Sequence, residues 1–152
     1  MKKLLSALVA GIVAALAVAA LALGAAQGTY KVSATLGAKA EVPAPAGVPA
    51  AAKGKFAGVY KENANGSAVL TWTLEFSGLS GPGTAAHIHM GKPGVAGPVI
   101  VPLCGPCKAM NGGKATISKA VIAALESGKG YVNVHTAKNA AGEIRGQIKV
   151  AG

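Results

Sequence analysis

Apolar and polar residues alternate strictly along several segments of the chain. In residues 67–76 every second residue is apolar, namely Ala68, Leu70, Trp72, Leu74 and Phe76. Residues 30–36 and 143–150 show the same alternation, and the last of these places Ile144, Ile148 and Val150 opposite Glu143, Arg145, Gln147 and Lys149. Because successive side chains of a strand point to opposite faces, each segment predicts a strand with one buried face. Trp72 is the predicted anchor of the core.

Shorter extended runs separated by Gly, Pro and Asn predict further strands at residues 55–59, 84–90, 98–101 and 131–136. One helix is predicted, residues 119–126, which Ser118 caps and Gly128 ends. A parallel α/β fold would need a helix after most strands. The pattern therefore predicts an all-β fold, an antiparallel β-sandwich or Greek-key barrel with one short helix.

The first residues have the pattern of an export signal. Lys2 and Lys3 precede an uncharged stretch, residues 4–23, and small residues stand at Gly24 and Ala26. Residues 1–26 are therefore predicted to be a signal peptide. An apolar stretch of this length also spans a bilayer, so an uncleaved anchor stays open. In either case we expect residues 28–152 to form one exported domain that is periplasmic, on the cell surface or secreted.

Residues 27–152 carry 13 basic and 5 acidic side chains, a formal charge of +8, and contain no aspartate. Such a surface attracts anionic partners weakly at low salt. Arginines and aromatic residues that could stack on bases are scarce, which argues against nucleic-acid binding. The lack of aspartate excludes a Ser/His/Asp triad. The five glutamates lie on separate segments, which argues against paired-carboxylate hydrolysis. No membrane contact is predicted beyond the N-terminal segment.

The three histidines are the main candidates for chemistry. Alternation places Ala86, Ile88 and Met90 on the core face, so that His87 and His89 project together from the other side. His135 lies on the polar face of its own strand. If the two strands are neighbours, the three imidazoles converge and suit a copper or zinc ion. Two alternatives are catalysis without metal and a structural role, in which the histidines hydrogen-bond to Asn133, Thr136 or Glu143.

Cys104-Gly105-Pro106-Cys107 has the letters of a redox-active motif, but no helix is predicted to begin at the first cysteine. In an exported protein, two close cysteines are typical of a disulfide. The alternatives are a redox-active pair and two metal thiolates that join His87 and His89.

Glu143 and Arg145 lie two residues apart on one strand face. They are expected either to form a solvent-facing pair or to belong to a structural polar network with Asn133, Thr136 or His135.

Several motifs together resemble the CHRD domain, which is repeated in chordin and occurs alone in exported bacterial proteins. They are Glu41-Val42-Pro43, Ala86-His87-Ile88-His89, the run from Gly130 to Thr136 and the run from Gly142 to Ile148. The resemblance implies an extracytoplasmic β-sandwich that acts as a binding or structural module, more a binding protein than an enzyme. Its partner would be an unidentified protein or envelope ligand.

A weaker similarity is to Cu/Zn superoxide dismutase, in which a His-x-His strand holds copper. His87 and His89 match that motif, and His135 could supply a further ligand. With three histidines and no aspartate the full two-metal site cannot form. The alternative function is therefore a copper-dependent or thiol redox enzyme.

Overall fold

A computed structural model describes residues 27–152, and the predicted signal segment lies outside the described residues. The chain forms β1 (Thr29–Gly37), a 3-10 turn (Ala38–Ala40), β2 (Lys53–Glu62), β3 (Ala68–Ser77), β4 (Gly83–Met90), β5 (Val99–Cys104), β6 (Met110–Ile117), α1 (Lys119–Glu126), β7 (Gly130–Thr136), β8 (Ile144–Gln147) and β9 (Lys149–Ala151).

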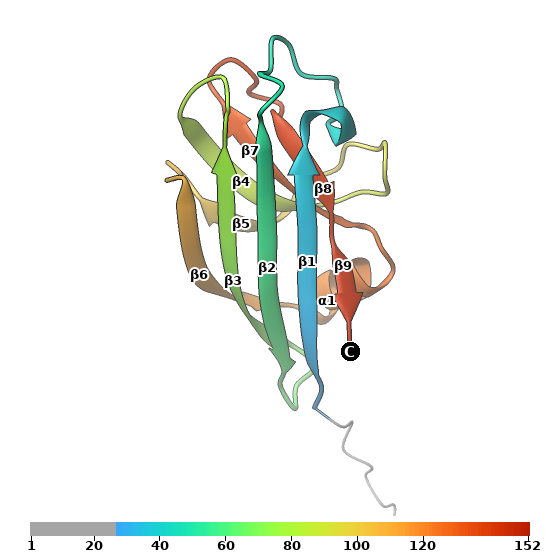
Figure 1. The fold of residues 1–152 in the computed structure, drawn as a ribbon. Coiled ribbons are helices and arrows are strands. Elements are labelled where there is room, and N and C mark those ends of the chain that lie inside the picture. Colours follow the sequence, from blue (N-terminus) through green and yellow to red (C-terminus); the bar gives the residue numbers. More distant parts are fainter. Residues whose placement is uncertain (1–26) are drawn as a thin grey trace, which may run out of the picture.

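The strands form one sheet in the order β5-β4-β7-β8-β1-β2-β3-β6, and β9 also pairs with β1. Every pairing is antiparallel. The sheet curls until β5 and β6, its two ends, contact each other, which makes a nearly closed barrel (Figure 1). The predicted antiparallel all-β fold with one short helix is confirmed.

The core fills the barrel with the residues that alternation placed inward. Phe56, Leu70 and Leu74 are fully buried, and the Trp72 ring stacks at 6.5 Å from that of Phe56. Helix α1 packs Ile122 and Leu125 into the same core cluster. Its N-terminus is capped as predicted, because the amide of Val121 donates to the Ser118 hydroxyl at 3.4 Å.

Strand β6 was not predicted, because Gly112-Gly113 and the polar residues before it are typical of a loop. The pairing with β3 explains the glycine: Gly113 lies opposite Trp72, and a Cβ atom there would come within 2.9 Å of the indole ring. The glycine therefore makes room for the large side chain that anchors the core.

Met90 was expected on the core face, and that prediction is wrong, since the side chain is 43% exposed. It is the last residue of β4, where the chain leaves the barrel for the loop of residues 91–98. The predicted final strand is also divided, because β8 ends before Ile148 and β9 begins after it. Within residues 27–152, no helix is long and apolar enough to cross a bilayer.

Candidate metal centre

The strands that carry the three histidines are neighbours. In the pairing of β4 with β7, His87 lies opposite Asn133, and His89 lies opposite Tyr131. His135 lies opposite Ala85, one step further along the same polar face. Because β4 and β7 are adjacent, the imidazoles meet on the outer side of the sheet, which the core does not occupy.

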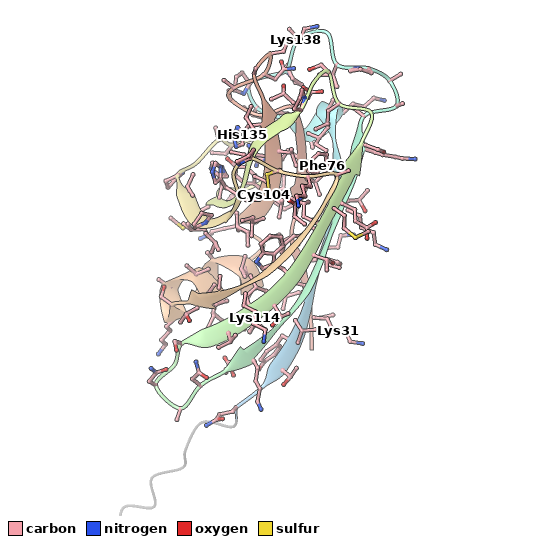
Figure 2. The ribbon with its side chains drawn as sticks, turned by 90° about the vertical axis from the view of Figure 1, so that its left-hand side faces the viewer. Lys31, Phe76, Cys104, Lys114, His135 and Lys138 are labelled. Carbon is pink, nitrogen blue, oxygen red and sulfur yellow. A yellow bond between two sulfur atoms is a disulfide. The ribbon has the colours of Figure 1, made fainter. Side chains whose placement is uncertain are left out.

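His87, His89 and His135, the histidine cluster, each offer a ring nitrogen, and these nitrogens lie within 4.8 Å of one another. Nδ1 of His87 and Nε2 of His135 are 3.1 Å apart. His89 and His135 are each 9% exposed, whereas His87 is less deeply buried. The cluster is thus shielded by protein on most sides and reaches solvent mainly through His87. Figure 2 shows His135 on the opposite side of the barrel from Lys31.

Backbone carbonyls fix which nitrogens of the cluster carry a proton. Nδ1 of His89 donates to the carbonyl oxygen of Gly97 at 2.8 Å, and Nδ1 of His135 donates to that of Ala140 at 3.0 Å. A carbonyl oxygen only accepts, so both Nδ1 atoms carry hydrogen and both neutral rings present a lone pair at Nε2. Nε2 of His89 is buried and has no hydrogen-bond partner. Metal-ligating histidines are oriented by the same kind of bond.

Burial favours the neutral form of these rings. It lowers the pKa of His87 below the ordinary value of 6.5, and charge on His135 and His89 would lower this pKa further. Burial also lowers the pKa of His135, although the hydrogen bond to Ala140 opposes the change. At neutral pH burial therefore favours, for His87 and His135, the form that ligates metals.

The His89 ring packs against Tyr131, which in turn packs against Arg145. The His89 ring lies parallel to that of Tyr131, with centroids 5.0 Å apart and planes 11° apart. The Arg145 guanidinium packs 3.4 Å from the centroid of the same tyrosine ring and donates to the carbonyl oxygen of Lys92 at 2.9 Å. The amide of Gly97 donates to the Tyr131 hydroxyl at 3.1 Å. Tyr131 and Arg145 thus hold the loop that carries the carbonyl partner of His89.

The expectation of a solvent-facing Glu143–Arg145 pair is wrong, because the side chains are 0% and 1% exposed, respectively. Both point away from the barrel core, but loops cover that side of the sheet. Glu143 accepts hydrogen bonds from the Ser80 amide (2.6 Å), the Thr136 hydroxyl (2.6 Å) and the Asn139 amide group (3.1 Å). Burial alone would raise the pKa of Glu143, but the hydrogen bond from the Ser80 hydroxyl, together with those from Thr136, the Ser80 amide and Asn139, outweighs it and lowers the pKa.

The structural alternative for the histidines named Asn133, Thr136 and Glu143 as their partners. The structure gives the rings other partners, namely the carbonyls of Gly97 and Ala140 and the contact between two imidazoles.

Sequence reasoning missed Glu41, which is 4% exposed and lies close to Asn133 beside Gly142. Burial raises the pKa of Glu41, against the opposing effects of the Val42 amide and the Arg145 charge. Three buried atoms of this group have no hydrogen-bond partner, namely Oε2 of Glu41, Oδ1 of Asn133 and Nη1 of Arg145. Prolines place Glu41 in a loop, and its position in the Glu41-Val42-Pro43 motif is the signal that could have marked it.

Cys104 and Cys107 are joined by a disulfide with Cα atoms 5.2 Å apart. The amide of Cys107 donates to the carbonyl oxygen of Gly83, so the bridge lies against the start of β4. The group of potential metal ligands found among the described residues contains the three histidines and neither sulfur. The structure therefore does not bring the thiolates and His87 and His89 into one site.

In the comparison with protein families, the model of the CHRD domain matches residues 32–148. Searches of the curated proteins and of the solved structures found no match.

Proposed function

The chain belongs to the CHRD domain family, and on this basis we propose that it is an extracytoplasmic binding module that holds one copper or zinc ion through His87, His89 and His135. The observation that carries the proposal is the convergence of the three ring nitrogens within 4.8 Å. Two of the rings already have the tautomer that presents Nε2 as a ligand, because their Nδ1 atoms donate to carbonyl oxygens.

Neutral imidazoles suit copper and zinc better than magnesium or calcium, which prefer oxygen ligands. Three protein ligands leave a further coordination position for water or for a group of a binding partner. In the ion-free protein, Nδ1 of His87 faces Nε2 of His135 at 3.1 Å, and one of them must act as donor. The proton of the neutral His135 ring is on Nδ1, where it is donated to the carbonyl oxygen of Ala140, so the donor in the contact between the two rings is His87. Ion binding would break this contact and free Nε2 of His135.

The test is the metal content of the mature protein, purified from the periplasm without a histidine tag and measured by mass spectrometry. We expect close to one copper or zinc ion per chain in the wild type and its loss in the His87→Ala/His89→Ala variant. The matched control, Thr71→Ala/Thr73→Ala, changes two exposed residues of β3 and should keep the ion. Circular dichroism establishes that all three proteins are folded. Folded wild-type protein that takes up neither ion, even when titrated with each, would refute the metal site.

The extracytoplasmic location rests on the predicted signal segment and on the disulfide, because disulfides persist in oxidising compartments. Fractionation of cells followed by mass measurement of the purified chain tests it. Cleavage after Ala26 gives a chain that begins at Gln27, whereas an uncleaved anchor leaves the full chain in the membrane fraction. Recovery of the full chain in the cytoplasm would contradict the proposal.

A copper-dependent redox enzyme is the alternative that the open coordination position favours. It predicts superoxide dismutation by the copper-loaded protein that the His87→Ala/His89→Ala variant lacks. Copper-loaded wild-type protein without this activity would leave the binding module as the function.

A further inference from the structure

The lysines that look scattered along the sequence gather on one side of the barrel. Six of the twelve in residues 27–152 project from the outer face of β9, β1, β2, β3 and β6, namely Lys31, Lys53, Lys55, Lys61, Lys114 and Lys149. All six are exposed. Glu75 is the acidic residue among the described residues of this face, so the face has a formal charge of +5. We call it the lysine face.

Strand register places these charges on a common surface. Lys31, Val59, Thr71 and Lys114 form one row across β1, β2, β3 and β6. From the spacing of strands and residues, the lysines extend over about 19 Å across the strands, from β9 to β6, and about 27 Å along them. Figure 2 shows Lys31 projecting from the outside of the sheet, away from helix α1. A surface of this size covers several repeating units of a polymer.

The lysine face is hollowed. A shallow depression of about 590 Å³ crosses its centre, with Ala57 and Gly58 among its lining residues and Lys31 and Lys149 beside them. A second hollow of about 410 Å³ is lined by Lys55 and Lys149. The small residues of β2, Ala57 and Gly58, leave room for a chain to lie between the lysines. A flat bilayer surface would not enter these depressions.

The chemistry of the face selects among anionic partners. Its outward side chains are lysines, serines, threonines, Glu75, Met110 and a few aliphatic residues, and none of them is aromatic. The single arginine of the chain, Arg145, is buried on the other side. Nucleic-acid binding relies on stacking aromatics and on arginine, so this face does not suit it. Lysine charges flanked by hydroxyls suit a polymer that combines anionic groups with hydroxyls.

We propose that the lysine face is a docking surface for an anionic polysaccharide, which lies in the depressions between Lys31, Lys55 and Lys149. The inference is independent of the histidine cluster, because the cluster lies on the outer face of β4 and β7. A carboxylated chain would place its anionic groups against the ammonium groups and its hydroxyls against Ser33, Thr71 and Thr73, which line the central depression.

The test measures binding of the purified mature protein to polygalacturonate, with neutral dextran as the reference polymer. Two variants remove the same charge: Lys31→Gln/Lys55→Gln/Lys149→Gln on the lysine face, and Lys108→Gln/Lys119→Gln/Lys129→Gln on exposed residues elsewhere. We expect the first variant to bind polygalacturonate about tenfold more weakly and with a shallower salt dependence, the control to bind as the wild type does, and dextran not to bind.

Equal weakening of binding in both variants would overturn the proposal, because it would mean that only net charge matters. Absence of polygalacturonate binding at low salt would also overturn it. Two further arms use phosphatidylglycerol vesicles and single-stranded DNA, and stronger lysine-face-dependent binding to either would assign the face to that partner instead. All six substituted lysines are exposed, so unchanged denaturation midpoints are expected and serve as the folding control.

Discussion

Replacement of Glu143 by Gln tests whether the buried carboxylate holds the loops over the outer face of β7 and β8. Oε1 of Glu143 accepts from the Ser80 amide, and Oε2 accepts from the hydroxyls of Ser80 and Thr136 and from the Asn139 amide group. Glutamine keeps the shape but replaces one acceptor oxygen by a donor. The hydroxyls can rotate to adapt, whereas the Ser80 amide cannot.

The other orientation of the glutamine amide also leaves a donor unpaired. In that orientation the new NH2 group would face Nδ2 of Asn139, and the Asn139 amide group cannot flip because its Oδ1 accepts from the Ala46 amide at 2.8 Å. One buried donor is therefore left unpaired, at a cost of about 1–3 kcal/mol, and the remaining bonds lose their charge assistance. Relief from burying a charge offsets part of this loss. We expect Glu143→Gln to lower the free energy of unfolding by about 2–3 kcal/mol.

Urea denaturation at pH 7 without reductant measures the change, and we expect the midpoint to fall by about 1–2 M. Glu75→Gln, an exposed glutamate on β3, is the matched control and should shift stability by less than about 0.5 kcal/mol. The folded-state pKa of Glu143 lies below its ordinary value of 4.5. Its stabilisation is therefore complete above pH 4.5 and disappears as the pH falls through the folded-state pKa, so the gap between the proteins should narrow in acid. Equal midpoints at pH 7, or a gap that persists unchanged in acid, would refute this reasoning.

Three further predictions concern the core and the histidine cluster. Tyr60→Phe removes a hydroxyl that donates to Glu126 at 2.7 Å, and we expect a loss of about 1 kcal/mol in urea denaturation. Gly97→Ala would drive a Cβ atom into the carbonyl oxygen of Met90 and displace the Gly97 carbonyl that orients His89. The affinity for copper or zinc, measured by calorimetry, should therefore fall at least about tenfold. In the control Gly81→Ala the new Cβ atom meets open space, so the affinity should stay unchanged. In ion-free protein, burial lowers the pKa of His87 and of His135 below 6.5. The unfolded chain therefore binds more protons than the folded one, and the free energy of unfolding should fall as the pH is lowered from 7.5 to 5.5. A rise in this free energy over the same range would contradict the assigned direction of the pKa shifts.

Local pattern was sufficient for most of the fold. Side chains of a strand alternate with a period of two whatever the partner strand, so residues 67–76 alone identified their buried face. The helix of residues 119–126 was delimited correctly because its cap and its terminating glycine are neighbours in sequence. Strand β6 was not predicted because the reason for Gly113 is its contact with the Trp72 ring, and these two residues are 41 positions apart in the chain.

The sequence predicted the histidine cluster only on the condition that two particular strands are neighbours. The sequence placed His87 and His89 on one strand face, but their meeting with His135 required β4 and β7 to be neighbours, and that pairing joins residues 48 positions apart. The carbonyls of Gly97 and Ala140, which set the tautomers, belong to loops whose course no periodicity encodes.

The sequence by itself therefore determined most of the strands, the helix, most of the inward faces and the family motifs, because each of these depends on residues close together in the chain. Only the tertiary structure decided which outward residues are buried and which are exposed. Glu143 and Lys149 stand on the same polar face of the final segment, yet loops cover the first and solvent reaches the second. Strand order likewise gathered single lysines into one face, because proximity across a sheet follows from pairing and not from distance along the chain.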